Sequence, residues 1–182
     1  MQIRIRRFAI YLVGLALFAG VPGPGSAAAR PVIAFRSDRA GDSNWEIYVM
    51  DADGGDQHNI SNHPGEDRDP GWSPDGRRIL FVSARGDDRK PVFREIHVMD
   101  ADGGNQRVVS KEATESLDPA WSPDGSAIAY TAYRDTNQEI VLIDPDGSNP
   151  RNLTNDPGGD AGPAWSPDGR SIAFYTSREA DV

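Results

Sequence analysis

The sequence of 182 residues contains no cysteine, only three histidines and a single long apolar run. Without cysteine the fold has neither disulfides nor thiolate metal ligands, so its stability depends on packing. The histidines occupy no common repeat position and have no partner at metal-ligand spacing, which argues against a histidine metal centre. No segment is long enough to be predicted as a helix. These absences favour an all-β protein without a metal centre.

The one apolar run, residues 8–21, lies at the amino terminus. Three arginines precede it, and three consecutive alanines ending at Ala29 follow it, which is the order typical of a secretory signal peptide. Its 14 residues fall short of the roughly 20 that a membrane-spanning helix needs. We therefore predict that residues 1–29 are a signal peptide, and that residues 30–182 form an exported domain in the periplasm or outside the cell, not inserted in a membrane.

Positive charge is also scarce. The net charge of the whole chain is −9, and it becomes −12 when the three arginines of the signal peptide are removed. An acidic surface repels phosphate backbones and anionic lipids, which argues against nucleic acid and membrane surfaces as partners. The charge is compatible with a cation or with a basic protein or peptide.

The chain is rich in an internal repeat. The string WSPDG begins at Trp72, Trp121 and Trp165, and the spacings of 49 and 44 residues lie in the range of propeller blades. The segments EIYVMDADG, EIHVMDADG and EIVLIDPDG recur at the same offsets. Each repeat holds four short segments of β-branched and aromatic residues, which predict four strands. Apolar residues occupy both alternation sets of the middle strands, so we expect both faces of each sheet to be covered.

Spacing within the repeat is constant except between the second and third strands. Such length variation is typical of loops on the binding face of a repeat protein. The three predicted loops are residues 36–45, 83–94 and 132–138. Within them, the residues predicted to form an interaction loop are Arg85, Arg89, Lys90, Arg94 and Trp45. Trp45 either contacts a partner or covers the edge of a blade.

The WSPDG string is suited to a tight turn between the first and second strands. Proline presets φ at the second turn position, glycine takes a left-handed conformation, and tryptophan packs between sheets. A triplicated serine nucleophile would need three bases, and no G-x-S-x-G elbow is present. We therefore predict no catalytic residue here. The residues assigned to these structural corners are Trp72, Pro74, Asp75, Gly76, Trp121, Pro123, Asp124, Gly125, Trp165, Pro167, Asp168 and Gly169.

Four carboxylates precede the tryptophans: Asp67, Asp69, Asp118 and Asp160. If the first strands line a central channel, these side chains form a ring at its mouth that holds a cation or a basic peptide. The alternative is that they are solvated loop residues. No other cofactor is predicted.

WSPDG, EIYVMDADG and RNLTN resemble the repeat of the TolB-like β-propellers, a family that includes periplasmic TolB and the propellers of dipeptidyl peptidase IV and tricorn-like proteases. The resemblance covers residues 30–182. It implies an all-β propeller, which in this family is usually a closed ring of six blades, and in TolB it is accompanied by an amino-terminal α/β domain. This sequence departs from both patterns, because it supplies only about three to three and a half blades and its repeat begins close to the predicted cleavage site.

Three functions can be compared with these features. We favour an exported, non-enzymatic propeller that binds a protein, a peptide or another ligand, with a partner in the cell envelope. The alternative is the propeller portion of a dipeptidyl peptidase IV-like serine peptidase. A metabolite-binding propeller enzyme would need clustered histidine, arginine and acidic residues on the first strands, which these repeats lack.

The strand count predicts an open arc. In chain order we expect a second, third and fourth strand, then two complete sets of four, then a first and a second strand. An arc leaves two apolar faces uncovered, which favours self-association. Two explanations remain open, namely a piece of a longer gene product or a homodimer that completes the ring with strands exchanged at the seams.

Overall fold

The computed structural model describes residues 32–39, 44–85, 93–111, 115–134 and 136–178. Every regular element within these residues is a β-strand. In chain order the strands are β1 (Val32–Ser37), β2 (Glu46–Asp51), β3 (His58–Asn59), β4 (Asp67–Trp72), β5 (Arg78–Ser83), β6 (Glu95–Asp100), β7 (Arg107–Val108), β8 (Glu115–Trp121), β9 (Ile128–Arg134), β10 (Asn137–Ile143), β11 (Arg151–Asn152), β12 (Asp160–Trp165) and β13 (Ile172–Thr176). The predicted signal peptide lies outside the described residues.

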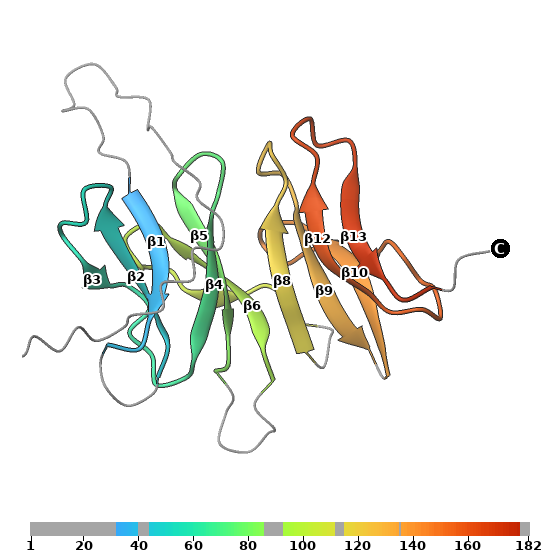
Figure 1. Ribbon diagram of the computed structural model, residues 1–182, viewed down its shortest axis with the longest axis horizontal. Helices are drawn as coiled ribbons and strands as arrows, with labels where there is room; N and C mark the ends of the chain where they lie inside the picture. Colours follow the sequence, from blue (N-terminus) through green and yellow to red (C-terminus); the bar gives the residue numbers. More distant parts are fainter. Residues whose placement is uncertain (1–31, 40–43, 86–92, 112–114, 135, 179–182) are drawn as a thin grey trace, which may run out of the picture.

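The strands form four antiparallel sheets in which sequence neighbours pair (Figure 1). We call them blades 1 to 4. Blade 1 is β1-β2-β3, blade 2 is β4-β5-β6-β7, blade 3 is β8-β9-β10-β11 and blade 4 is β12-β13. Blades 2 and 3 therefore hold four strands each, blade 1 holds the second to fourth strands, and blade 4 holds the first and second. This confirms the predicted strand assignment.

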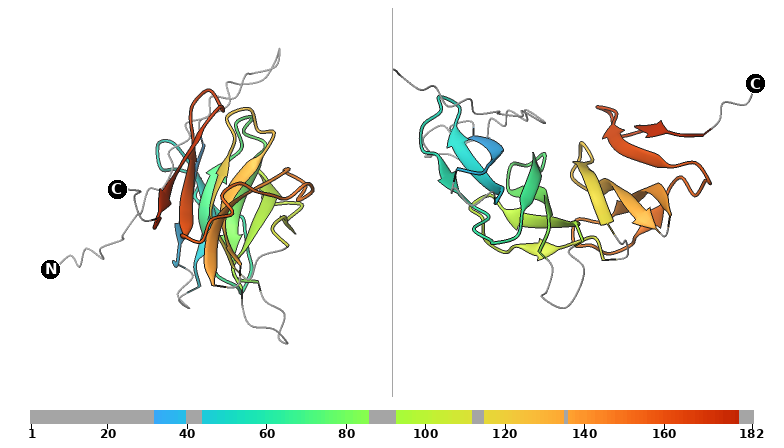
Figure 2. Two further views of the ribbon diagram at one scale, coloured as in Figure 1. Left: turned by 90° about the vertical axis from the view of Figure 1, so that its right-hand side faces the viewer. Right: turned by 60° about the horizontal axis from the view of Figure 1, so that its bottom comes forward.

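The blades stand side by side in an open arc (Figure 2). The first strands β4 and β8 contact each other, and β8 also contacts β12, so that the first strands form the concave side of the arc. The arrangement confirms a propeller-type architecture with an unclosed ring.

The core lies between blades, not within one. One cluster joins Ile47, Val49 and Ile60 of blade 1 to residues such as Phe81 and Met99 of blade 2. A second cluster joins blades 2 and 3 through the opposite face of β5, where Leu80 and Val82 are at most 1% exposed. Both faces of β5 are thus covered, as predicted for a middle strand, and burial of each such side chain contributes about 1.5 to 3 kcal/mol.

The fourth strands are short, with two residues in each of β3, β7 and β11. The ladder nevertheless continues into the predicted centres of these strands. There the backbone N–H groups of Ile60, Val109 and Leu153 donate to the third-strand carbonyls of Ile47, Ile96 and Ile140 at 2.8 to 2.9 Å. The outer edge of a blade therefore rests on a few backbone hydrogen bonds.

The WSPDG corners are structural. In blade 2, the Gly76 N–H donates to the Ser73 carbonyl at 2.9 Å, and the Ser73 hydroxyl donates to Asp75 at 2.6 Å while accepting from the Arg78 N–H at 2.9 Å. The equivalent bonds recur at Ser122 and in the corner of blade 4. The three corner glycines have φ of 67°, 71° and 70°, as predicted. Each serine hydroxyl thus donates one hydrogen bond and accepts one within its own turn.

Successive corners also stack on each other. The indole N–H of Trp121 donates to the Gly71 carbonyl of the preceding blade at 3.3 Å, and that of Trp165 donates to the Ala120 carbonyl at 3.2 Å. A Cβ atom on Gly125 would lie 3.5 Å from the Pro74 ring of the preceding corner. The corner motif thus connects strands within a blade and fixes the approach of the next blade.

The corner carboxylates should stay ionised to a lower pH than ordinary aspartates do. The Ser122 hydroxyl, followed by the N–H and hydroxyl of Ser126, lowers the pKa of Asp124 to about 2 from the ordinary 3.8. A lowered folded-state pKa gives stability that is present above the ordinary pKa and is lost as the pH falls through about 2. We expect an NMR titration of the Asp124 carboxyl to have its midpoint near 2, and Ser122→Ala to move it towards 3.8. An ordinary midpoint in the unaltered protein would contradict the corner geometry.

Candidate functional site

The connections between second and third strands lie at one end of the blades, which we call the mouth face. There the N–H of Asp67, at the start of β4, donates to the Trp45 carbonyl at 2.7 Å, and the N–H of Ser116 in β8 donates to the Arg94 carbonyl at 2.7 Å. These bonds hold the residues before β2 and β6 against the first strand of the next blade. The described residues at the ends of these connections therefore border the concave side of the arc.

A β-bulge shapes each first strand near this face. Asp69 and Asp118 sit at the bulges of β4 and β8, where two residues oppose one on the neighbouring strand. Their φ angles are 51° and 49°, in the left-handed region that aspartate tolerates better than most residues. Gly162 occupies the same position in β12, with φ of 66°. The bulge turns these side chains away from the sheet ladder.

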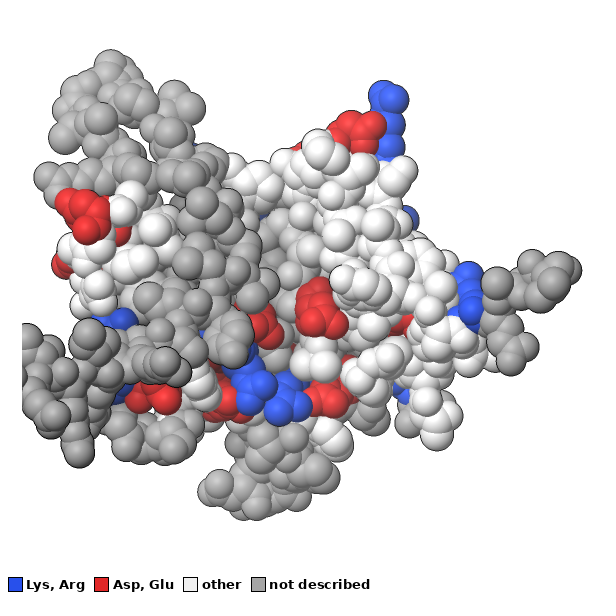
Figure 3. Space-filling view, in the orientation of Figure 1, with Lys and Arg blue, Asp and Glu red and all other residues white. Residues whose placement is uncertain are grey.

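Charged groups and one aromatic ring meet at the mouth face, and we call them the mouth cluster: Arg36, Trp45, Asp69, Arg94, Glu115 and Asp118. Arg36 lies 3.5 Å from Asp69, and its guanidinium is 5.0 Å from the centre of the Trp45 ring. Arg94 pairs with Glu115 at 2.6 Å, and Asp118 accepts a hydrogen bond from the Thr131 hydroxyl at 3.1 Å. Figure 3 shows acidic and basic side chains side by side in the lower centre of the molecule.

The electrostatics of the mouth cluster favour an added positive charge. Burial raises the pKa of Asp69; the Arg36 guanidinium lowers it, and the carboxylate of Asp118 on the next blade raises it further, so that the net pKa lies above the ordinary value. Two carboxylates of neighbouring blades are therefore close enough to repel each other. A cationic group placed beside them would relieve this repulsion.

The predicted ring of four carboxylates does not hold for Asp67 and Asp160, which are 0% exposed. Asp67 accepts from the Ser83 hydroxyl at 2.5 Å and pairs with Arg85 at 2.8 Å. Asp160 pairs with Arg178 in the same way. Burial raises the pKa of Asp160, but the hydrogen bonds from Thr176 and Arg178 outweigh it, so the pKa is lowered overall. Both carboxylates are structural, and only Asp69 and Asp118 remain at the mouth.

The predicted interaction loop needs a similar correction at Arg85. Its guanidinium is tied to Asp67, donates to Gln106 at 2.5 Å and lies over the Phe81 ring, so it holds blade 2 together instead of facing a partner. Arg94 and Trp45 do lie on the mouth face. The other two basic residues of that prediction, Arg89 and Lys90, lie outside the described residues.

A repeated pattern in the sequence indicates that Arg85 is structural. The prediction of an interaction loop considered one loop alone and missed this pattern. An arginine stands six residues after the first isoleucine of every second strand, at Arg39, Arg85, Arg134 and Arg178. A serine or threonine stands two residues before three of them, and in blades 2 and 4 an aspartate begins the first strand. A residue that recurs in phase with the strands is more plausibly part of the blade than of a variable loop.

Among the histidines that the structure describes, His97 is buried in the core. The buried ring of His97 lies against Phe81, with the ring centres 5.5 Å apart, and both ring nitrogens lack hydrogen-bond partners. Burial, followed by the positive charge of Arg85, lowers the pKa of His97 to about 4, so this histidine is neutral near pH 7. In the part of the chain that the structure describes, no group of three or more histidine or acidic residues is arranged to hold a metal ion. The same residues contain no helix long and apolar enough to span a membrane.

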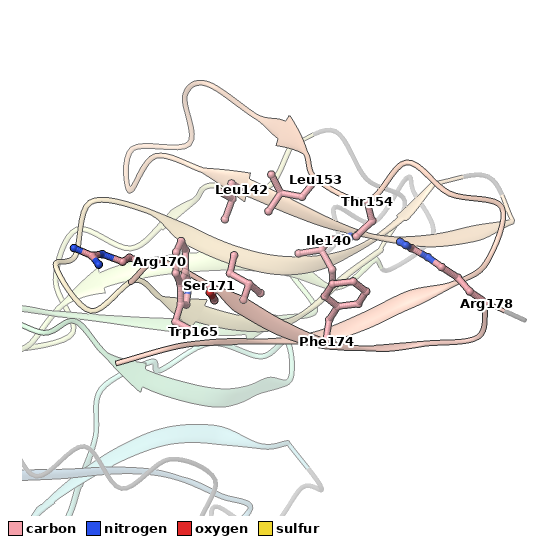
Figure 4. A pocket seen from close by; sticks show the side chains of 10 residues that line it. Ile140, Leu142, Leu153, Thr154, Trp165, Arg170, Ser171, Phe174 and Arg178 are labelled. Carbon is pink, nitrogen blue, oxygen red and sulfur yellow. The ribbon is translucent and has the colours of Figure 1, made fainter. Parts of the chain in front are cut away.

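A second concave region is apolar. A groove of about 420 Å³ lies between blade 3 and β13, lined by Ile140, Leu142, Leu153 and Phe174 among others (Figure 4). Leu153 is 46% exposed and Phe174 is 37% exposed. The groove is the place where a third strand of blade 4 would pack, because it faces the outer strands of blade 3.

Repeated four-stranded meanders joined by stacked WSPDG corners define a β-propeller. The chain belongs to the TolB beta propeller domain family, since residues 87–182, more than half of the chain, match the model of that family. Among curated proteins, none matches the chain significantly.

Solved structures agree with this assignment. A putative TolB from Agrobacterium tumefaciens is 28% identical, with a TM-score of 0.68 over 83% of this chain and 52% of that chain. TolB from Acinetobacter baumannii is 23% identical, with a TM-score of 0.62 over 82% of this chain and 36% of its own. The tricorn protease is 21% identical, with a TM-score of 0.61 over 82% of this chain and 14% of its own. The last two likenesses concern the fold alone. The chain spans about half, or less, of the length of these proteins.

Proposed function

We propose that this chain is an exported propeller module, without enzymatic activity of its own, that binds a basic segment of another protein at the mouth face. The signal-peptide pattern of residues 1–29 and the 28% identity to a putative TolB support export and an envelope setting. The net charge of −9 supports a basic partner.

The proposal rests on one observation, that Asp69 and Asp118 occupy the same bulge position in the neighbouring strands β4 and β8, which contact each other. Arg36 neutralises only one of the two, at 3.5 Å, and among the described residues Asp118 has a hydroxyl partner but no cationic one. A lysine or arginine side chain beside both carboxylates would gain charge-assisted hydrogen bonds. Trp45 and Arg36 border the same place and add an aromatic surface of the kind enriched in protein interfaces.

Binding is tested with a capped Lys-Arg-Lys-Arg peptide, followed by tryptophan fluorescence. We expect a saturable change that Trp45→Phe removes and that weakens with salt. The double variant D69N/D118N should bind at least about tenfold more weakly, because a hydrogen bond to a charged group contributes about 1.5 to 3 kcal/mol. Asparagine tolerates the left-handed backbone at both positions, so the fold should be kept.

The matched control is D102N/D146N, which removes the same charge from exposed turns between third and fourth strands, at the other end of the blades. If both double variants weaken binding equally, the attraction is general and the mouth cluster is not the site. A titration with calcium chloride tests whether a metal cation, instead of a basic peptide, binds at the mouth cluster. Binding of calcium without binding of the peptide would overturn the proposal.

A further inference from the structure

The two ends of the arc have complementary strand content. Among the described residues, blade 1 has no first strand beside β1, and blade 4 has no third or fourth strand beside β13. A single four-stranded blade would result if β12 of one end were followed by β1, β2 and β3 of the other. Such a blade would use β1 in place of β13.

β1 and β13 are interchangeable in sequence and position. Ile33-Ala34-Phe35 in β1 is identical to Ile172-Ala173-Phe174 in β13, and both triplets start the second strand of their blades. Trp165 of β12 pairs with Ile172, as Trp72 pairs with Ile79 in blade 2. The same register would pair Trp165 with Ile33 of a second copy.

The indole of Trp72 lacks the acceptor that the other two corner tryptophans have. Trp121 and Trp165 donate to the carbonyl that precedes the tryptophan of the previous blade, whereas the buried Nε1 of Trp72 has no hydrogen-bond partner. By the repeat, the missing acceptor is the carbonyl at the position of Gly71 and Ala120. In blade 4 this residue is Ala164, at the far end of the same chain.

The apolar faces of the two ends also match. The groove of Figure 4 exposes 46% of Leu153, whereas the equivalent Ile60 and Val109 are 5% and 1% exposed between complete neighbours. The interface of blades 1 and 2 packs Ile47, Val49 and Ile60 against Ile79, Phe81 and Met99. The equivalent sets at the two open ends are Ile140, Leu142 and Leu153 on blade 3 and Ile33, Phe35 and Met50 on blade 1.

Arg39 supplies a further correspondence. Like Arg85, it lies over the aromatic ring of its own second strand, at 5.2 Å from Phe35, and it donates to a glutamine, Gln57, at 2.6 Å. In blade 2 the arrangement is completed by Asp67, which pairs with Arg85. This aspartate has no counterpart in the described part of blade 1. In a shared blade that partner would be Asp160 of the second copy.

We propose that two copies of this chain close one ring by exchanging strands, with β1 of each copy replacing β13 of the other beside β12. Two complete blades from each copy and two shared blades at the seams give six blades, within the range of closed propellers. The exchange replaces the β12–β13 pairing with an equivalent one and adds β2 and β3 over the exposed groove. It does not rest on peptide binding at the mouth face, and dimerisation is measured without the peptide.

The first test compares two phenylalanines that are equivalent in the repeat. We expect the purified protein to sediment at twice the mass of one chain at micromolar concentration. Phe35→Asp should make it monomeric, because Phe35 enters the shared blade, whereas Phe174→Asp should leave the dimer, because β13 is displaced. A monomeric unaltered protein, or equal effects of the two substitutions, would overturn the proposal. The unaltered protein would also be monomeric if another segment or another protein took the place of the first strand of blade 1.

The second test locates the seam and does not depend on a disruptive substitution. Since the chain has no cysteine, an A34C/A164C variant can form disulfides only among the introduced cysteines. These positions correspond to Ala129 and Ala120, which are directly paired in blade 3. We expect mild oxidation to give a covalent dimer, while the control A120C/A129C gives a covalent link within one chain. A dimer that does not cross-link through A34C/A164C would show that another surface is used.

Discussion

Arg85→Ala is expected to lower the free energy of unfolding by about 3 to 5 kcal/mol, because it leaves a buried carboxylate without its cation. Asp67 is 0% exposed, and Arg85 is 2.8 Å away with only 13% of its side chain exposed. The Ser83 hydroxyl would remain on Asp67, but a neutral donor does not replace the lost charge. Urea denaturation, with all proteins at the same concentration, measures the change.

Arg94→Ala is the matched control, since it removes an arginine from the same connection. Its pair with Glu115 is about one third exposed on both sides, 37% and 30%, so we expect a loss of no more than about 1 kcal/mol. Similar losses for the two substitutions would mean that Arg85 is not anchored as the structure has it, and would restore it as a candidate for partner binding.

Gly103→Ala should destabilise the protein more than the same change at Gly54, although the two glycines occupy equivalent turns with φ of 86° and 85°. The left-handed backbone costs an alanine roughly 1 to 2 kcal/mol at either position. A Cβ atom on Gly103 would in addition collide with the Ile60 carbonyl of blade 1, whereas at Gly54 nothing lies within 4 Å. Overpacking of this kind adds about 1 to 3 kcal/mol.

The comparison is best made with Phe35→Asp as the background. In the proposed ring, Gly54 would face the Leu153 carbonyl of the second copy, so only the monomer keeps its surroundings open. Gly147, whose Cβ would lie 2.8 Å from the Val109 carbonyl, should behave like Gly103. Equal costs at Gly54 and Gly103 would mean that adjacent blades do not touch through their turns.

The strands could be predicted from the sequence because their spacing is almost rigid. Each corner needs the same five residues, and each third strand is followed at a constant distance by its turn, so three in-phase copies fix the sheets and their strand content. The short fourth strands were located by Ile60, Val109 and Leu153, which do continue the ladder.

The alternation of side chains along a strand could not distinguish the buried acidic residues from those at the mouth face. Asp67 and Asp69 are two positions apart in β4, which in a regular strand would place them on one face. The bulge after Arg68 changes the register, so that Asp67 pairs inward with Arg85 while Asp69 turns to the mouth. The pair Asp69-Pro70 was the local sequence feature that indicated an irregular strand. The left-handed φ of Asp69, however, appears only in the folded chain.

The contact between successive corners has an evolutionary consequence. The indole N–H groups of Trp121 and Trp165 donate to backbone carbonyls of the blade before them, those of Gly71 and Ala120. A carbonyl is present whatever side chain stands there, so one blade does not have to be tailored to the next. Duplication or loss of a whole repeat in the gene would therefore create a new junction that already fits, and genes of this kind are free to vary in length by whole repeats.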